Sequence, residues 1–307
     1  SNNTAVGANA LLANTTGNLL VAVGDDSLST NTTGARNTAL GRNTMNANTT
    51  GTGNTAVGNN ALSTQTEADD NVAVGRNAMT ANTSGTDNVS VGAYSLDANT
   101  TGTDNTAIGD NALGANTTAS YNVGVGADAL LLNTTGAQNT AVGTFALDVN
   151  TTGANNTAVG MHSLGANTTA DNNTGLGYGA LLYNTTGAQN TAVGTNALDA
   201  NTTAHNSTAV GYDALTTNTT GTENVAVGRW ALKANTTASY NTAIGTNTLQ
   251  VSTTGAYNTA VGRSALAANT TADSNTAVGY NSLTANTTGA NNVAVGYLAL
   301  DANTTGT

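Results

Sequence analysis

The chain has 307 residues, a net charge of −11, and neither cysteine nor proline. Without cysteine there are no disulfides or thiolate metal sites, and the isolated acidic residues do not suit nucleic acid, which is bound by clustered lysine and arginine. No stretch approaches the ~18 consecutive apolar residues of a spanning helix, so we expect no membrane span in this segment.

Glycine recurs at every seventeenth position, and the residues around it repeat in the same phase. The first unit, residues 3–19, reads N-T-A-V-G-A-N-A-L-L-A-N-T-T-G-N-L, and its positions are numbered here as columns one to seventeen. The next units are 20–36 and 37–53, and the series continues to the end of the chain. So strict a period is typical of a repeat architecture. We predict one repetitive domain, residues 1–307, with eighteen coils of seventeen residues and no visible caps.

Each unit opens with a predicted strand, because columns one to five alternate and are rich in Thr and Val. Columns two and four share one face, as with Thr4 and Val6, and column nine is Leu or Met in every unit. We expect these three columns to form the core. The fold class is therefore all-β: a parallel β-solenoid, or β-roll, in which identical columns stack at the ~4.8 Å spacing of neighbouring strands.

Four further columns have predicted structural roles. Columns one and twelve are mostly Asn and column thirteen is always Thr, which predicts ladders of like side chains along the stack. Column three is almost always Ala, so we expect a close neighbour there, either the opposite wall of a flat coil or another chain. Column five is always Gly, and we interpret it as a corner whose backbone conformation a Cβ forbids. The candidate structural corners include Gly7, Gly24, Gly41, Gly58, Gly75 and Gly92.

Charged residues fall at columns six, seven, ten, sixteen and seventeen, with Glu67 the one exception. These columns are expected to face solvent, because an unpaired charge is costly to bury. Aromatic residues occupy largely the same columns. The candidate surface-contact residues are Tyr212, Trp230, Tyr240, Tyr257, Tyr280 and Tyr297.

Two column patterns have a functional and a structural interpretation. Asn-Thr-Thr at columns twelve to fourteen matches the N-glycosylation pattern in nearly every unit, but a structural Asn ladder explains the same regularity and is preferred. Files of Thr at strand spacing suggest ice binding. The alternative is that the column-thirteen hydroxyls bond to backbone, as Thr side chains commonly do in turns, and we favour it.

Catalysis has little support in the sequence. His162 and His205 lie in different columns without a repeated acidic partner, and the adjacent acids at 25–26 and 69–70 lack the periodic pattern of calcium-binding solenoids. We expect no enzymatic activity, no metal and no cofactor.

Residues 88–96, N-V-S-V-G-A-Y-S-L, resemble the N-S-V-A-I-G-x-x-S-x-A head repeat of YadA-type trimeric autotransporter adhesins. Residues 71–75 and 292–296 resemble it equally well, and similar N-T-A-V-G repeats occur in bacterial surface proteins and phage tail-fibre-like proteins. The resemblance implies a left-handed β-roll, three chains side by side, and adhesion at a bacterial surface. The period of seventeen is longer than the typical head unit, and the N-T-T-G segment is extra.

Together these patterns predict an extracellular, cell-surface structural fibre or adhesin shaft of a bacterium or phage, without catalytic activity. Its expected partners are further copies of the chain, as a homotrimer or an end-to-end filament, and a host or surface ligand. The alternative is a ligand-binding solenoid that takes ice, a glycan or a host receptor on its exposed Thr and Tyr columns.

Overall fold

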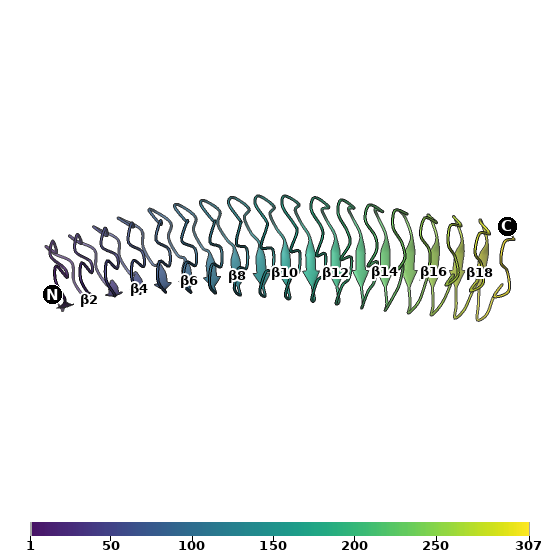
Figure 1. Ribbon diagram of the computed structural model, residues 1–307, viewed down its shortest axis with the longest axis horizontal. Coiled ribbons are helices and arrows are strands. Elements are labelled where there is room, and N and C mark those ends of the chain that lie inside the picture. Colours follow the sequence, from purple (N-terminus) through teal and green to yellow (C-terminus); the bar gives the residue numbers. More distant parts are fainter. Residues whose placement is uncertain (1, 307) are drawn as a thin grey trace. The chain divides into compact units, whose positions relative to one another are not determined.

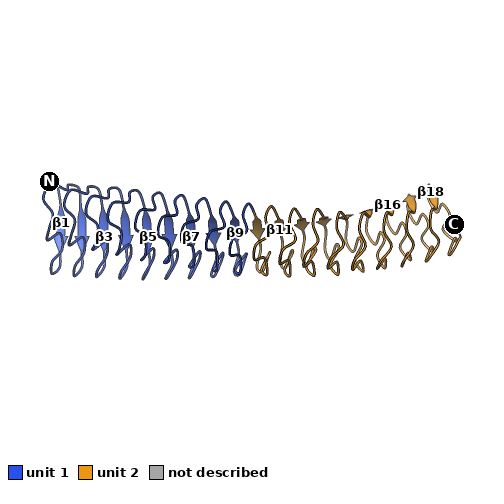
Figure 2. Cartoon of the chain, turned by 90° about the horizontal axis from the view of Figure 1, so that it is seen from above, with its two compact units in different colours: residues 1–155 blue, residues 156–307 orange. Residues whose placement is uncertain are grey.

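The computed structural model describes residues 2–306 and contains one three-residue strand in each seventeen-residue unit, here called a rung. All strand pairings are parallel, and each residue pairs with the residue seventeen positions later, as Ala73 does with Ser90. The contacts divide the chain into two compact units, Ser1–Asn155 and Asn156–Thr307, which Figure 2 colours separately. Each unit is described by itself.

In unit 1, nine strands pair in sequence order, each with the next (Figure 1). They are β1 (Thr4–Val6), β2 (Val21–Val23), β3 (Thr38–Leu40), β4 (Thr55–Val57), β5 (Val72–Val74), β6 (Val89–Val91), β7 (Thr106–Ile108), β8 (Val123–Val125) and β9 (Thr140–Val142).

Unit 2 repeats the arrangement with nine further strands in sequence order (Figure 1). They are β10 (Thr157–Val159), β11 (Thr174–Leu176), β12 (Thr191–Val193), β13 (Thr208–Val210), β14 (Val225–Val227), β15 (Thr242–Ile244), β16 (Thr259–Val261), β17 (Thr276–Val278) and β18 (Val293–Val295). The predicted fold class, an all-β parallel β-solenoid with turns of seventeen residues, is confirmed.

The interior of a rung holds small side chains, and the expectation that columns two and four form the core is wrong. Val91 and Ile108, in column four, are 36% and 40% exposed, whereas the column-three residue Ala107 is completely buried. Strand alternation puts columns two and four on one face but does not say which face is inside. A Cβ on Gly124, in column three, would already touch the Leu113 side chain, so this position has no room for a larger residue.

The opposite wall of the coil lies against column three, as one of the two alternatives for that column proposed. Leu113, in column nine, is completely buried, which confirms the prediction for that column. Ala112, in column eight, is also completely buried and was not predicted to be in the core. The leucine supplies most of the apolar burial in a rung. Full burial of such a side chain stabilises the folded chain by about 1.5–3 kcal/mol.

Two buried files of asparagine run along the stack and bond it together. In column twelve, the Asn99 amide donates to Asn82 Oδ1 at 2.9 Å and to the Gly102 carbonyl at 3.0 Å. In column one, the Asn88 amide donates to the same Gly102 carbonyl at 2.9 Å, and its Oδ1 accepts the backbone N–H of Asn105 at 3.0 Å. The predicted Asn ladders therefore exist, and they satisfy buried backbone groups between rungs.

Column five forms the corner after each strand, as predicted. Gly109 has φ +140°, a conformation that side chains with a Cβ rarely adopt, and the corner glycines Gly7, Gly24, Gly41, Gly58, Gly75 and Gly92 have φ between +131° and +145°. A Cβ on Gly109 would also overlap the carbonyl group of Gly126 in the next rung. Glycine is thus required there for both conformation and space.

Columns seven, nine and seventeen adopt left-handed backbone conformations with residues other than glycine. Within one rung these are Asn111 at φ +53°, Leu113 at +54° and Tyr121 at +63°. Asn tolerates this region well, but for Leu it costs about 1–2 kcal/mol. Burial of the leucine side chain offsets that cost, and the three turns let seventeen residues close one flat coil.

Candidate interaction surfaces

The outer face is defined here as the side chains of columns two and four, which recur in every rung of both units. Column two is Thr in twelve of the eighteen rungs and Val in six, and column four is Val, Ile or Leu throughout. No position of these two columns carries a charge. Monomeric proteins rarely expose a contiguous apolar patch of more than a few hundred Å², and larger ones mark interaction sites.

The threonines of columns thirteen and two differ in how their hydroxyls are used. In column thirteen, Thr83 donates to the Thr100 carbonyl at 2.9 Å, and Thr100 donates to the Thr117 carbonyl at 2.9 Å. This supports the structural interpretation of that file. The column-two hydroxyls, such as those of Thr55 and Thr106, make no hydrogen bond within residues 2–306, so they are free to bond to water or a partner.

The predicted surface-contact residues lie at two edges of the outer face in unit 2. Tyr212, Tyr280 and Tyr297 lie just after their strands, in column six, and Tyr240 and Tyr257 lie just before theirs, in column seventeen. These five tyrosines are exposed, whereas Trp230 is half-buried. The structure stacks Tyr240 on Tyr257 and Tyr280 on Tyr297, but it does not gather all six residues into one site.

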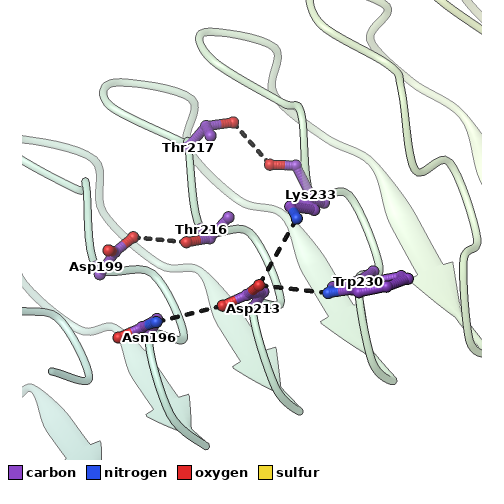
Figure 3. A network of polar contacts seen from close by, with 7 residues as sticks. All are labelled: Asn196, Asp199, Asp213, Thr216, Thr217, Trp230 and Lys233. Atoms are coloured by element: carbon purple, nitrogen blue, oxygen red, sulfur yellow. Dashed lines mark hydrogen bonds and ion pairs between the residues drawn. The ribbon is translucent and has the colours of Figure 1, made fainter. Parts of the chain in front are cut away.

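Trp230 is held in a polar network that spans three rungs (Figure 3). Its indole N–H donates to Asp213 at 3.3 Å, and Asp213 also pairs with Lys233 at 3.7 Å and accepts from the Asn196 amide at 3.4 Å. The Arg229 guanidinium lies 3.6 Å from the ring centroid. The ring is therefore already engaged by its own chain, which makes Trp230 a poorer ligand contact than the sequence predicts.

Asp199 borders this network, and burial raises its pKa although a hydrogen bond from Thr216 opposes the shift. A raised folded-state pKa favours the protonated form, so the free energy of unfolding should fall as pH rises from the unfolded to the folded pKa. We predict that Asp199→Asn removes this dependence and stabilises the chain at pH 7 by about 0.5 kcal/mol or less, because the carboxyl is half-exposed. Urea unfolding at pH 3 and pH 7 measures both effects. Asp87→Asn, at an exposed position, is the control for the loss of one negative charge.

The two histidines lie apart. His205 Nδ1 accepts the Ala188 N–H at 2.9 Å, and the His162 ring packs edge-on against Tyr178 at 6.4 Å. Across residues 2–306 there is no group of three or more His, Cys, Asp or Glu side chains that could hold a metal ion. The same residues enclose no pocket. Nor do they include a helix long and apolar enough to span a membrane.

Asparagines of the Asn-Thr-Thr segments are poor glycosylation acceptors in the folded chain. The side chains of Asn99 and Asn116 are completely buried, and each amide donates to its neighbours in the ladder. A glycan on such an amide would replace one of its two N–H donors and would have to open the rung to fit. The structural interpretation of this pattern is the one that the packing supports.

No protein-family model matches the chain, and no curated protein matches it.

Proposed function

We propose that this chain is an extracellular structural fibre or adhesin shaft of a bacterium or phage, built by lateral association of copies through their outer faces. The outer face carries the proposal: it is uncharged, mostly β-branched and half-exposed, although most rungs bury only one large apolar side chain. Two sheets with faces of this composition pack well against one another: the sheets lie ~10 Å apart, and their side chains interdigitate. The repeat resemblance to surface adhesins and tail-fibre-like proteins supports the same role and a trimer.

The hydrogen bonds between consecutive rungs are of the kind that a long shaft needs. Each rung presents to the next a strand edge and two Asn files, so length grows by repetition without a new packing solution. Nothing in this role requires a catalytic group, and the proposal is of a non-catalytic protein. An end-to-end filament remains part of the proposal as a second mode of self-association.

We predict that Val91→Lys/Val125→Lys abolishes association. Both residues lie in column four, and two ammonium groups would be desolvated between packed sheets, whereas in the free chain they reach water. Light scattering after size-exclusion chromatography should give a multiple of the chain mass for the natural sequence and a single chain for the variant, with unchanged circular dichroism.

Ala93→Lys/Ala127→Lys is the matched control, because it adds the same charge to the same rungs two residues later, in solvent-facing column six. The control should associate like the natural chain. A natural chain that is monomeric at every concentration, or a control that dissociates equally, would refute lateral association through this face.

A second candidate function, ice binding, is favoured by the free hydroxyls of column two. Thr hydroxyls and Val methyls alternate across the outer face in register with the strands, so they present a regular array to water. The array lies on columns two and four and not on column thirteen, where the sequence first suggested it. Thermal hysteresis from the monomeric chain, lost in the Val91→Lys/Val125→Lys variant, would favour ice over a second copy.

A further inference from the structure

Four of the nine tyrosines form two stacked pairs between consecutive rungs. The ring centroids of Tyr240 and Tyr257 are 5.0 Å apart with an interplanar angle of 8°, and those of Tyr280 and Tyr297 are 5.4 Å apart at 12°. The four side chains are 46%, 61%, 39% and 73% exposed, in that order. Each pair is thus both preassembled and reachable from solvent.

The parallel register fixes these distances. Thr242 pairs with Thr259 two residues after the first pair of rings, and Ala277 pairs with Ala294 three residues before the second. Exposed tyrosines elsewhere have no such partner. The residues one rung away from Tyr212 in its column are Thr195 and Arg229, and those beside Tyr121 are Asp104 and Gln138.

We propose that the two stacked pairs are sites of oxidative tyrosine cross-linking, in which a haem peroxidase with hydrogen peroxide joins consecutive rungs covalently. Each phenol loses one electron and one proton to give a tyrosyl radical. The two radicals couple through ring carbons ortho to the hydroxyl groups, and the hydrogen on each coupled carbon moves to the phenolic oxygen. The peroxide takes up the two electrons and two protons and becomes two molecules of water.

Proximity makes this reaction specific to the stacked pairs. Radical coupling between free tyrosines is bimolecular, whereas two rings held about one strand spacing apart react as an intramolecular pair. The chain has no cysteine, so a redox cross-link between rungs has to use another side chain. The product would link the rung of β14 covalently to that of β15, and the rung of β17 to that of β18.

Trypsin gives a direct test, because cleavage after Lys233 and Arg263 isolates each pair in its own peptide. Residues 234–263 contain Tyr240 and Tyr257 as their only tyrosines, and residues 264–307 contain only Tyr280 and Tyr297. After treatment of the full chain with horseradish peroxidase and hydrogen peroxide, both peptides should be lighter by two hydrogen atoms. Dityrosine fluorescence per chain should be independent of protein concentration.

Tyr240→Phe keeps the stacked rings but removes one phenol, so it should abolish the link within 234–263 and leave the link within 264–307 unchanged. The natural chain unfolded in urea is the second control, and its yield within these peptides should fall at least tenfold. The proposal is overturned if cross-links form mainly between chains and rise with concentration. It is equally overturned if the unfolded chain links the same tyrosines as well as the folded one does.

Discussion

Gly109→Ala should be among the most destabilising single substitutions in the chain, with a loss of about 3 kcal/mol or more in the free energy of unfolding. Two effects add. The φ of +140° is strained for any residue with a Cβ, and the new methyl group would overlap the Gly126 carbonyl in the next rung. Because that neighbour is backbone, relief requires β7 and β8 to move apart, which breaks the strand register. Urea unfolding followed by circular dichroism measures the loss.

Gly114→Ala is the matched control for this prediction, since Gly114 lies in the same rung and the substitution adds the same methyl group. Its φ is not in the strained positive range, and a Cβ there would meet the Asn111 carbonyl at 3.2 Å and a flexible Leu131 methyl at 3.4 Å. Because Ala also limits the unfolded chain more than Gly does, the control should be within about 1 kcal/mol of the natural protein. If the two variants were equally stable, the corner would not need glycine.

The sequence predicts most of the fold because its signals are columns and not single residues. Invariant glycine predicts the corner, and the asparagines that fill most positions of columns one and twelve predict the ladders that Asn88 and Asn99 form. We predicted the wrong face of the strand to be buried, because the hydrophobic side chains of a Val-x-Val pattern suggest a core on whichever side of the strand they lie. The better signal was the small residue between them: only Ala, Ser or Gly occurs in column three.

Surface features were less predictable, for physical reasons that differ between residues. Column numbers place Tyr240 and Tyr257 one above the other, so their stacking could have been inferred from the period alone. The engagement of Trp230 by Arg229 and Asp213 depends on side-chain rotamers, which no column pattern specifies. The left-handed backbone at Leu113 also leaves no trace in residue type, because the buried position selects for size and apolarity.

Asn105→Leu should destabilise unit 1 by roughly 2–4 kcal/mol although leucine is larger and more apolar. Asn105 is completely buried; its amide donates to the Ala119 carbonyl at 2.9 Å, and its Oδ1 accepts the Asn122 N–H at 3.0 Å. Leucine leaves the Asn122 N–H without an acceptor in a dry interior. Urea unfolding gives the loss, and hydrogen exchange at Asn122 should be much faster than in the natural chain.

The chain itself supplies the control for this substitution. Ser207 stands in column one, and its hydroxyl still accepts the Asn224 N–H at 3.3 Å, so Asn105→Ser should retain part of the stability that Asn105→Leu loses. Leu20 shows that one rung can lack the amide, but it is the only column-one position occupied by an apolar residue. Equal stability of the serine and leucine variants would mean that stacking depends on the strands and leucines alone. If Asn105→Ser loses less stability than Asn105→Leu, the buried column of Asn side chains bonds each rung to the next.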